Sequence, residues 1–576
     1  MSAQSLPQSP ARLRLALYAL AAVGVILAVR LFYWQIIEWD KLNALALKQQ
    51  TIKTEIPPHR GRIRTSDGLL LAADHYLYSI RVNSKMTRDP QDQIKIGGEL
   101  AAILGQPIGT VMGKLQADKP DWLVRDVSAQ TGEAIIALKE KYRLTNLDVE
   151  MRLTRFYPAG SLAGPVVGFV NVERKPSSGI EAYMNMPLSG KPGKLNAVGD
   201  AMRDVIPFDV QTNVAAEDGA EIILTIDATM QRIVETELAN AIRSTRATSG
   251  CVIVLDPQTG AVLAMAVWPS ADLNAYFESA NQDKYKNTAV SALYEPGSVF
   301  KVVTLAAALD ARTVTPATVF EDIGYIDFGG VRTKNHDEQA HGRVTLTDVM
   351  RQSLNVETVK MSVGLGAERF YQYVRDFGFG SITRVEQMPE MPGEVKAPGD
   401  GVWRDVELAT NAFGQGLSAT PLQMVRAIAA VANQGKLMRP YIVKEVREAN
   451  GRRTVTQSQL VRQVVRPETA QIVTRILSDS IIAESSNKAI VPGYRVAGKT
   501  GTSQISGIGG YEKTGTIASF AGYLPADDPR FVILVKLDRP QSSEWGSQVA
   551  SPVFAEVAKQ LVALIGLPPD HVRIGK

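Results

Sequence analysis

Two short motifs about two hundred residues apart carry the residue types that nucleophilic catalysis needs. The first, Ser298-Val299-Phe300-Lys301, places a hydroxyl and an amine three residues apart. In a helix this spacing puts both groups on one face. Serine is a weak nucleophile until a neighbouring base takes its proton, and a desolvated lysine can do so. The motif therefore predicts Ser298 as a nucleophile and Lys301 as its base.

The second motif, Lys499-Thr500-Gly501-Thr502, adds another ammonium, a hydroxyl and a glycine that lets a substrate approach the backbone closely. Lys301 must be neutral to act as a base. Lowering its pKa from about 10.4 to about 7 or 8 takes roughly 3 to 4 kcal/mol of desolvation and like-charge repulsion. Lys499 would supply the repulsion if it lies close to Lys301.

A third motif, Ser353-Leu354-Asn355, lies between the other two in the sequence. It falls in a helical pattern from Asp348 to Val359 that starts after Thr345 or Thr347. A serine and an asparagine two residues apart are common. Ser353 and Asn355 are therefore candidates only because they lie between the other two motifs.

Both outer motifs occur twice. Ser485-Ser486-Asn487-Lys488 repeats the first pattern, but no helical apolar run follows it, which predicts a solvated loop. Lys513-Thr514-Gly515-Thr516 repeats the second. The Gly-rich turn of residues 506–510 predicts that the two copies lie on opposite sides of a hairpin, with the later copy near its exposed tip. Small residues before Lys499 favour the earlier copy, because they let a sheet edge meet a ligand.

The elements that must position these motifs belong to a domain predicted over residues 221–576. Helices around an antiparallel sheet fit the α+β class. The expected strands are residues 222–227, 250–255, 261–268, 494–504 and 531–535, and the expected helices are residues 301–311 and 554–565. Residues 250–255 and 261–268 are predicted to form a hairpin of two buried strands.

Residues 38–220 are predicted to form a separate pedestal of mixed α and β structure. Residues 100–104 and 131–142 fall in short amphipathic helical patterns. No nucleophile–base pair is found in this segment, so a structural role is predicted for it.

The N-terminus predicts a cytoplasmic tail over residues 1–14 and a membrane anchor over residues 15–37. Arg12 and Arg14 precede the apolar run, so the positive-inside rule places everything after it outside the cytoplasm. The alternative is a cleaved signal peptide, but the apolar run continues well past its candidate cleavage site. Arg30 lies within the run, either snorkelling to the outer interface or contacting a partner membrane helix.

The composition excludes other classes of function. Lys and Arg total 63 against 59 Asp and Glu, a net charge of only +4, and no basic block supports nucleic-acid binding. Cys251 is the single cysteine, so no intramolecular disulfide forms, and its apolar surroundings predict a buried side chain. His336 and His341 flank two acids, but a polar loop is expected there rather than a metal site. No metal or organic cofactor is predicted.

Together these residues resemble the class B penicillin-binding proteins, which are monofunctional peptidoglycan DD-transpeptidases. The resemblance implies a penicillin-binding, serine β-lactamase-like transpeptidase domain on a pedestal. It also covers motifs outside the three described, namely Arg60-Gly61 with Asp67-Gly68, Arg155 to Gly160, Gly179-Ile180-Glu181, Tyr294-Glu295-Pro296-Gly297 and Gly414-Gln415-Gly416. The single anchor and the length look most like the division-specific septal type, with the elongation-specific type as the alternative.

The resemblance also implies roles for the motif residues. Ser298 would attack the penultimate D-alanine carbonyl of a stem pentapeptide, and an amine of a neighbouring stem peptide would then take the acyl group. By motif, Lys301 is the base, Ser353 relays the proton to the leaving amine and Asn355 holds the substrate amide. Lys499 sets the electrostatics of the site. Thr500, Gly501 and Thr502 bind the substrate, and the two threonine hydroxyls bind the substrate carboxylate. The backbone N–H groups of Ser298 and Thr502 would form an oxyanion hole.

The implied partners are stem peptides with D-Ala-D-Ala ends and amine acceptors, β-lactams, the membrane, a polytopic membrane glycosyltransferase and other division proteins. The implied location is the cell (inner) membrane, with one pass and an extracytoplasmic catalytic domain. Two rival hypotheses stay open. One is a hydrolase of the same fold, a β-lactamase or DD-carboxypeptidase, and the other is a β-lactam sensor or scaffold.

Overall fold

The computed structural model describes residues 10–199, 205–483, 488–507 and 510–575, and its chain divides into two units. The first unit comprises Met1–Pro58 and Gly190–Asp218. Within the described residues, one helical segment, Pro10–Ile37, is long and apolar enough to cross a membrane, and it contains the predicted span of residues 15–37. The elements of this unit are α1 (Pro10–Phe32), a π-helical turn (Tyr33–Ile37), α2 (Trp39–Gln50) and the antiparallel strands β1 (Thr51–Ile56), β6 (Gly193–Gly199) and β7 (Val205–Val214).

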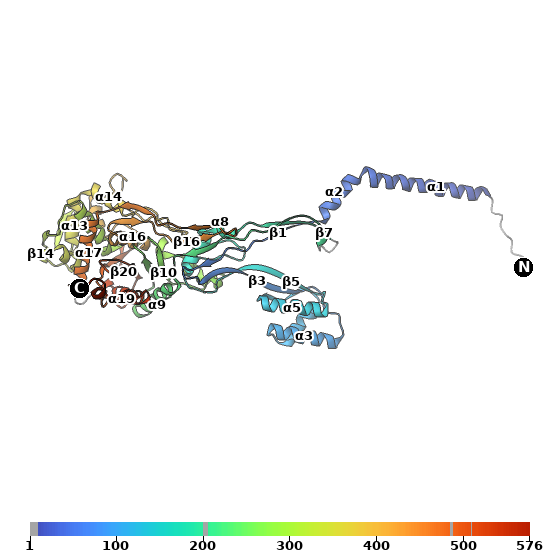
Figure 1. Cartoon of the computed structure of the whole chain (residues 1–576), viewed down its shortest axis with the longest axis horizontal. Coiled ribbons are helices and arrows are strands. Elements are labelled where there is room, and N and C mark those ends of the chain that lie inside the picture. The colour runs from blue at the N-terminus through green and yellow to red at the C-terminus, as the bar shows by residue number, and fades with distance from the viewer. Residues whose placement is uncertain (1–9, 200–204, 484–487, 508–509, 576) are drawn as a thin grey trace. The chain divides into compact units, whose positions relative to one another are not determined.

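The second unit, His59–Ser189 with Gly219–Lys576, holds all three motifs. Its centre is a five-stranded antiparallel sheet in the order β10-β9-β21-β20-β19. Figure 1 labels two of these strands, β10 and β20. These strands are β9 (Ser249–Leu255), β10 (Val262–Trp268), β19 (Ala497–Gly507), β20 (Gly510–Leu524) and β21 (Phe531–Asp538). The α+β class and the hairpin of buried strands are thereby confirmed.

Helices cover both faces of this sheet, which explains why strands β9, β10 and β21 are largely apolar. Along β9, Val252 and Val254 pack with α9 (Ala228–Thr245) and α19 (Ser551–Leu564). Cys251, Ile253 and Leu255 point to the other face, which α16 (Pro421–Ala432) and α17 (Pro467–Ile482) cover. The helix that follows Ser298, α11 (Lys301–Asp310), packs against α16 and α17 and is almost entirely buried.

A second, larger sheet crosses the predicted boundary at residue 220. Strand β8 (Glu221–Leu224) pairs in parallel with β2 (Ile63–Arg64) and antiparallel with β16 (Val443–Arg447). The sheet continues through β3 (Leu70–Val82) to β4 (Asp121–Val127) and β5 (Leu147–Phe156), and β17 (Arg453–Val455) forms its other edge. Helices α3 (Pro90–Leu104), α4 (Ile108–Leu115) and α5 (Ala129–Tyr142) share a core with β3, β4 and β5, and α5 contains the predicted helix of residues 131–142.

Buried ion pairs join three of the motifs noted above, which begin at Arg60, Arg155 and Gly179. The Glu181 carboxylate accepts from Arg60 Nε at 2.6 Å and from Arg155 Nε at 2.7 Å, and all three side chains are buried. Asp74 contacts Arg155 at 3.3 Å and Arg174 at 3.1 Å. Because removing one partner would leave a buried charge uncompensated, the arrangement fixes residues far apart in sequence against one another.

The remaining elements of the second unit are short. The helices are α6 (Gly164–Val167), α7 (Gly179–Tyr183), α8 (Asn185–Ser189), α10 (Thr288–Ser291), α12 (Leu346–Gln352), α13 (Asn355–Leu365), α14 (Ala367–Asp376), α15 (Asp405–Ala412), α18 (Gly546–Val549), α20 (Asp570–Arg573) and 3₁₀ turns at Leu273–Ala275, Ser279–Tyr285 and Gly297–Phe300. The strands are β11 (Val319–Asp322), β12 (Tyr325–Phe328), β13 (Val331–Lys334), β14 (Gly342–Thr345), β15 (Lys436–Met438) and β18 (Leu460–Gln463).

Candidate active site

Ser298 lies on the 3₁₀ turn that leads directly into α11, whose first residue is Lys301. The turn begins at Gly297, whose φ of 56° favours glycine, and the Gly297 N–H donates to the Gly414 carbonyl at 3.0 Å. A Cβ at Gly414 would meet the Gly297 carbonyl oxygen at 2.3 Å, so this position also requires glycine. Close backbone packing therefore presents the Ser298 side chain at the mouth of a cleft.

The Lys301 side chain is fully buried and its ammonium meets three oxygens. It donates to the Asn355 Oδ1 at 2.7 Å, to the Ser353 carbonyl at 2.5 Å and to the Ser353 Oγ at 3.3 Å. Burial lowers the pKa of Lys301 well below its ordinary value, and the nearby charge of Lys499 lowers it further, while Glu357 opposes the shift. Once Lys301 has lost a proton, a serine hydroxyl can donate to its free lone pair.

The helix predicted across Ser353 is wrong, because the chain breaks there. The capping box of Thr345 and Asp348 starts α12 as expected, but Ser353 adopts the left-handed conformation, with φ 57° and ψ 43°, and ends it. A second helix, α13, starts at Asn355. The Asn335 Oδ1 caps it by accepting from the backbone N–H of Asn355 at 3.0 Å. This break is what turns Ser353 and Asn355 toward Lys301.

The second predicted motif runs along the edge strand β19. Lys499 is 4% exposed, and its Nζ donates to the Thr500 carbonyl and Oγ1, each at 3.2 Å. A Cβ at Gly501 would meet Val299 at 2.8 Å and the Ser519 Oγ at 2.5 Å. Only glycine therefore lets the strand pass this close to the Ser298 turn.

These groups border one cleft of about 470 Å³. It brings together Ser298, Ser353, Asn355, Thr500 and Thr502 of the predicted site, and Lys301 and Lys499 lie buried beside it. Gly501 lies between the two cleft threonines on the strand. The cleft is also lined by residues that the sequence did not single out for catalysis, which are His336, Arg351, Gln352, Phe413, Gln415, Ser503, Gln504, Thr516, Glu544, Trp545 and Ser547.

Trp545 and His336 are the most notable of the cleft residues that the sequence did not predict. Their rings meet edge to face with centroids 5.8 Å apart. Burial lowers the pKa of His336, and the charges of Lys301 and Lys499 add to this shift while Asp337 opposes it. The Gly546 N–H donates to the Thr502 Oγ1 at 3.1 Å, which holds the Trp545 loop against β19. No local pattern marks Trp545, because only this tertiary contact brings it to the cleft.

The repeated motifs do not enter the site in the same way. Lys513-Thr514-Gly515-Thr516 lies on β20, the other strand of the hairpin, as predicted. The first copy pairs with residues 518–521 instead, although Thr516 of the second copy also lines the cleft. Residues 485–487 of the repeated first motif lie outside the described residues. His341 contacts Asp337 at 3.0 Å, and the described residues contain no group of three side chains suited to a metal.

The β19–β20 hairpin is tied to the segment that precedes Ser298. The Glu295 carboxylate accepts from the Ser506 Oγ at 3.1 Å and from the Tyr511 hydroxyl at 2.9 Å. Both partners lie toward the hairpin's end, so Glu295 links it to the Ser298 turn.

Removing the Tyr511 hydroxyl tests this link. Tyr511→Phe is expected to slow the reaction of Ser298, the predicted nucleophile, by up to about ten-fold, because a hydrogen bond to a charged group contributes roughly 1.5 kcal/mol. The thermal unfolding midpoint should stay close to that of the wild type. Stopped-flow acylation by a chromogenic β-lactam measures the rate, with Tyr183→Phe as the matched control on the exposed pedestal surface. Equal rates in the wild type and both variants would show that the hydrogen bond between Tyr511 and Glu295 does not help to position Ser298.

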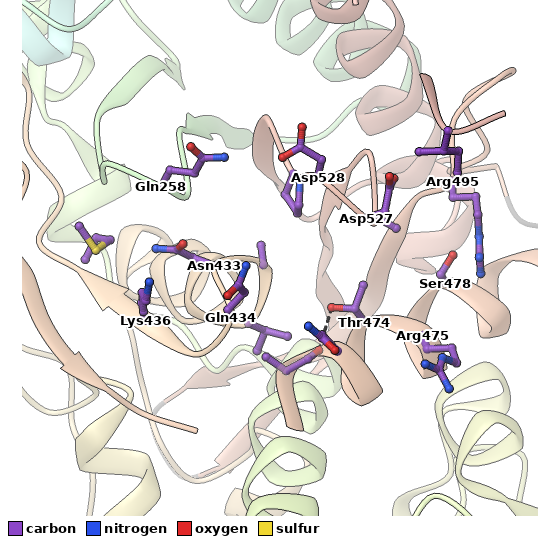
Figure 2. Close-up of a pocket in the computed structure, with 18 of the residues that line it drawn as sticks. Gln258, Asn433, Gln434, Lys436, Thr474, Arg475, Ser478, Arg495, Asp527 and Asp528 are labelled. Atoms are coloured by element: carbon purple, nitrogen blue, oxygen red, sulfur yellow. Dashed lines mark hydrogen bonds between the residues drawn. The ribbon is translucent and has the colours of Figure 1, made fainter. Parts of the chain in front are cut away.

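A hollow of about 770 Å³ in the second unit lies apart from Ser298 (Figure 2). Figure 2 shows Gln258 and Lys436 on one side and Arg475 and Arg495 on the other. Its lining mixes both charge signs, and Arg495 is already paired with Asp479 at 2.9 Å. It shares no residue with the cleft.

Comparison with known proteins agrees with this geometry. Residues 250–559 match the penicillin binding protein transpeptidase domain, and residues 55–224 match the penicillin-binding protein dimerisation domain. The chain is 33% identical to stage V sporulation protein D of Bacillus subtilis, over 96% of this chain and 86% of that protein. It is 28% identical to peptidoglycan D,D-transpeptidase FtsI of Escherichia coli, over 95% of this chain and 90% of that protein.

Solved structures resemble it as well. Penicillin binding protein 3 of Mycobacterium tuberculosis, solved in complex with aztreonam, is similar with a TM-score of 0.69 and 28% identity, covering 90% of this chain and 98% of that one. A peptidoglycan synthetase of Bifidobacterium adolescentis gives a TM-score of 0.72 at 26% identity, covering 90% of this chain and 98% of that one.

Proposed function

The chain belongs to the class B penicillin-binding proteins and is a cell-wall D,D-transpeptidase, and we propose that it works through an acyl-enzyme on Ser298 at the division septum. The observation that carries the proposal is the burial of Lys301 beside Ser298, among the oxygens of Ser353 and Asn355. Burial and a second lysine favour the neutral amine that a general base requires.

In the proposed acylation, the Lys301 amine takes the Ser298 hydroxyl proton as Oγ attacks the penultimate D-alanine carbonyl. The oxyanion that forms would lie between the N–H groups of Ser298 and Thr502, each worth about 3 kcal/mol. The support is the close packing of the two segments, since a Cβ on Gly297 would lie 3.0 Å from the Thr502 carbonyl oxygen. The C–N bond then breaks, and the terminal D-alanine leaves with a proton relayed through Ser353.

Deacylation repeats these steps with a new nucleophile. An amine of a second stem peptide attacks the Ser298 ester and loses its proton through Ser353 and Lys301, and Ser298 is released with its proton restored. Asn355 would hold the substrate amide, while Thr500 and Thr502 would hold the donor carboxylate. The Lys499 charge beside these hydroxyls favours a carboxylate there.

Product analysis tests this function directly. The purified full chain is incubated with a D-Ala-D-Ala stem peptide and an amine acceptor, and the products are identified by mass spectrometry. A cross-linked dimer is expected. A hydrolysed tetrapeptide alone would indicate a carboxypeptidase instead, and a persistent acyl-enzyme with neither product would indicate a sensor.

Lys499→Ala is expected to weaken acylation mainly at neutral pH. Removing the like charge raises the pKa of Lys301, so less of the amine is neutral at pH 7, and each unit of this rise lowers the rate about ten-fold. Raising the pH should restore part of the rate, so the measured profile shifts to higher pH.

The control for this variant is Lys488→Ala, which removes an exposed lysine of the repeated motif. The role proposed for Lys499 would be contradicted if Lys499→Ala, with normal circular dichroism, kept the wild-type acylation rate across the pH range.

The anchor and the partners are also part of the proposal. Pro10–Ile37 would cross the inner membrane once, with the N-terminus in the cytoplasm, residues 38–220 as the pedestal and residues 221–576 as the catalytic domain. The septal role and a polytopic membrane glycosyltransferase partner are proposed from the resemblance of the motifs to the division-specific type. Depletion in the native cell should then give filaments without septa. Rounded cells that still divide would favour the elongation role.

A further inference from the structure

A cavity of about 360 Å³ in the second unit, separate from the Ser298 cleft, is lined by an excess of positive charge. Its walls come from the end of α14, the loop after it, α16, β15 and β18. Five arginines line it, and they are Arg375, Arg384, Arg426, Arg439 and Arg462. The elements that carry them are far apart in the sequence, so no local pattern reveals the cluster.

Arg426 is the central feature, because it is only 6% exposed. Its Nε donates to the Met438 carbonyl at 2.9 Å, and no carboxylate of the described residues pairs with it. Its Nη1 lies beside Gly378, where a Cβ would stand only 2.8 Å away. The missing side chain at Gly378 thus makes room for the guanidinium end at the cavity wall. A buried cation without an acidic partner destabilises the fold unless another anion pairs with it.

The surrounding charges add to this imbalance. Arg375 and Arg384 form no ion pair with any residue that the structure describes, and both are exposed. Arg462 pairs with Asp376, and Arg439 contacts Glu386 at 3.4 Å.

The acids near the cavity are already engaged. Glu386 also accepts from the Ile442 N–H at 2.7 Å, and Glu390 is held by Thr383 and the Arg384 N–H. Burial lowers the pKa of Arg426 to about 10, against the pull of Glu390, so it stays charged at neutral pH.

We propose that this cavity binds a phosphate-type anion, an oxyanion with two or more negative charges. The planar guanidinium fork matches phosphate oxygens, and several unpaired guanidiniums suit a multiply charged ligand better than a single carboxylate. The anion is either a free phosphate or diphosphate, or the phosphate of a lipid headgroup. The proposal does not depend on the catalytic role of Ser298.

Calorimetric titration of inorganic pyrophosphate into the full chain, held in phosphatidylcholine nanodiscs, tests the site. Binding at one site is expected, weakening as salt rises. Arg426→Met should weaken it at least about ten-fold, and Arg375→Gln about three-fold. Arg243→Met, on the exposed surface of α9, is the matched control and should bind as the wild type does.

Three checks make the test decisive. The unfolding midpoint of Arg426→Met should equal or exceed that of the wild type, since a buried charge is removed. If that variant does not fold, the exposed Arg375→Gln and Arg384→Gln variants decide. Penicillin acylation of the same samples shows whether the protein is intact, independently of the site.

Nanodiscs that contain phosphatidic acid identify the source of the anion. Loss of pyrophosphate binding in them indicates a headgroup ligand, and unchanged binding indicates a free anion. No binding by an intact wild type in phosphatidylcholine, or equal weakening in Arg243→Met, would overturn the proposal.

Discussion

Ser298→Ala is expected to form no covalent adduct with a fluorescent penicillin under conditions that label the wild type fully. Removing a nucleophile costs on the order of a million-fold in rate, because the remaining groups have no atom to which the acyl group can be transferred. The fold should be unaffected, since the Ser298 hydroxyl makes no hydrogen bond within the described residues. Gel fluorescence and mass mapping of the adduct measure the effect.

The sequence offers a matched control for this experiment. Ser485→Ala removes the serine of the repeated motif and should label as the wild type does. An adduct that persists in Ser298→Ala and maps to another residue would refute the assignment. A folded wild type that neither labels nor hydrolyses penicillin would mean that the cleft is closed until a partner opens it.

Lys301→Met is expected to lower the acylation rate by about 10²- to 10⁴-fold, the usual contribution of a general base. Methionine fills a similar volume but cannot take the Ser298 proton. In the wild type the rate should rise with pH through the lowered pKa of Lys301, because only the neutral amine accepts a proton. The variant should lose this rise, and a stopped-flow pH profile measures both. A variant that keeps the wild-type profile would show that another group is the base.

Stability provides a second readout for the same variant. The folded pKa of Lys301 lies below its ordinary value of 10.5, so between these two values the unfolded chain binds more protons and wild-type stability rises with pH. Below the lowered pKa the wild type bears the full cost of a buried charge. Lys301→Met should therefore raise the free energy of unfolding most at acidic to neutral pH and least above pH 10.5, in denaturant titrations. A loss of stability at low pH would mean that its hydrogen bonds outweigh that cost.

The local part of the site was predictable from the sequence, and the part built by long-range packing was not. The spacing of Ser298 and Lys301 predicted their neighbourhood, because both lie on one short helical segment. The break at Ser353 was missed, because its cause lies outside the segment, in the Asn335 side chain that caps α13. Trp545 was missed for the same reason, since the contact of its loop with Thr502 spans more than forty residues.

The sheets show the same difference between local features, which were predictable, and long-range pairing, which was not. The apolar runs of β9 and β10 predicted buried strands, and the α+β class followed from them. Nothing in the sequence predicted that β8 would pair with both β2 and β16, since register between distant strands depends on the whole fold.

The sheet that joins β2, β8 and β16 also constrains the order in which the protein can fold. Its strands lie near residues 63, 222 and 445, so the ribosome must make most of the chain before the sheet can close. Until β16 emerges, β8 keeps an unpaired edge that can join to a strand of another chain. The sheet therefore cannot be completed until β16 has been made, and contacts this distant form slowly. We expect newly made chains to depend on chaperones that hold them unaggregated until synthesis passes β16.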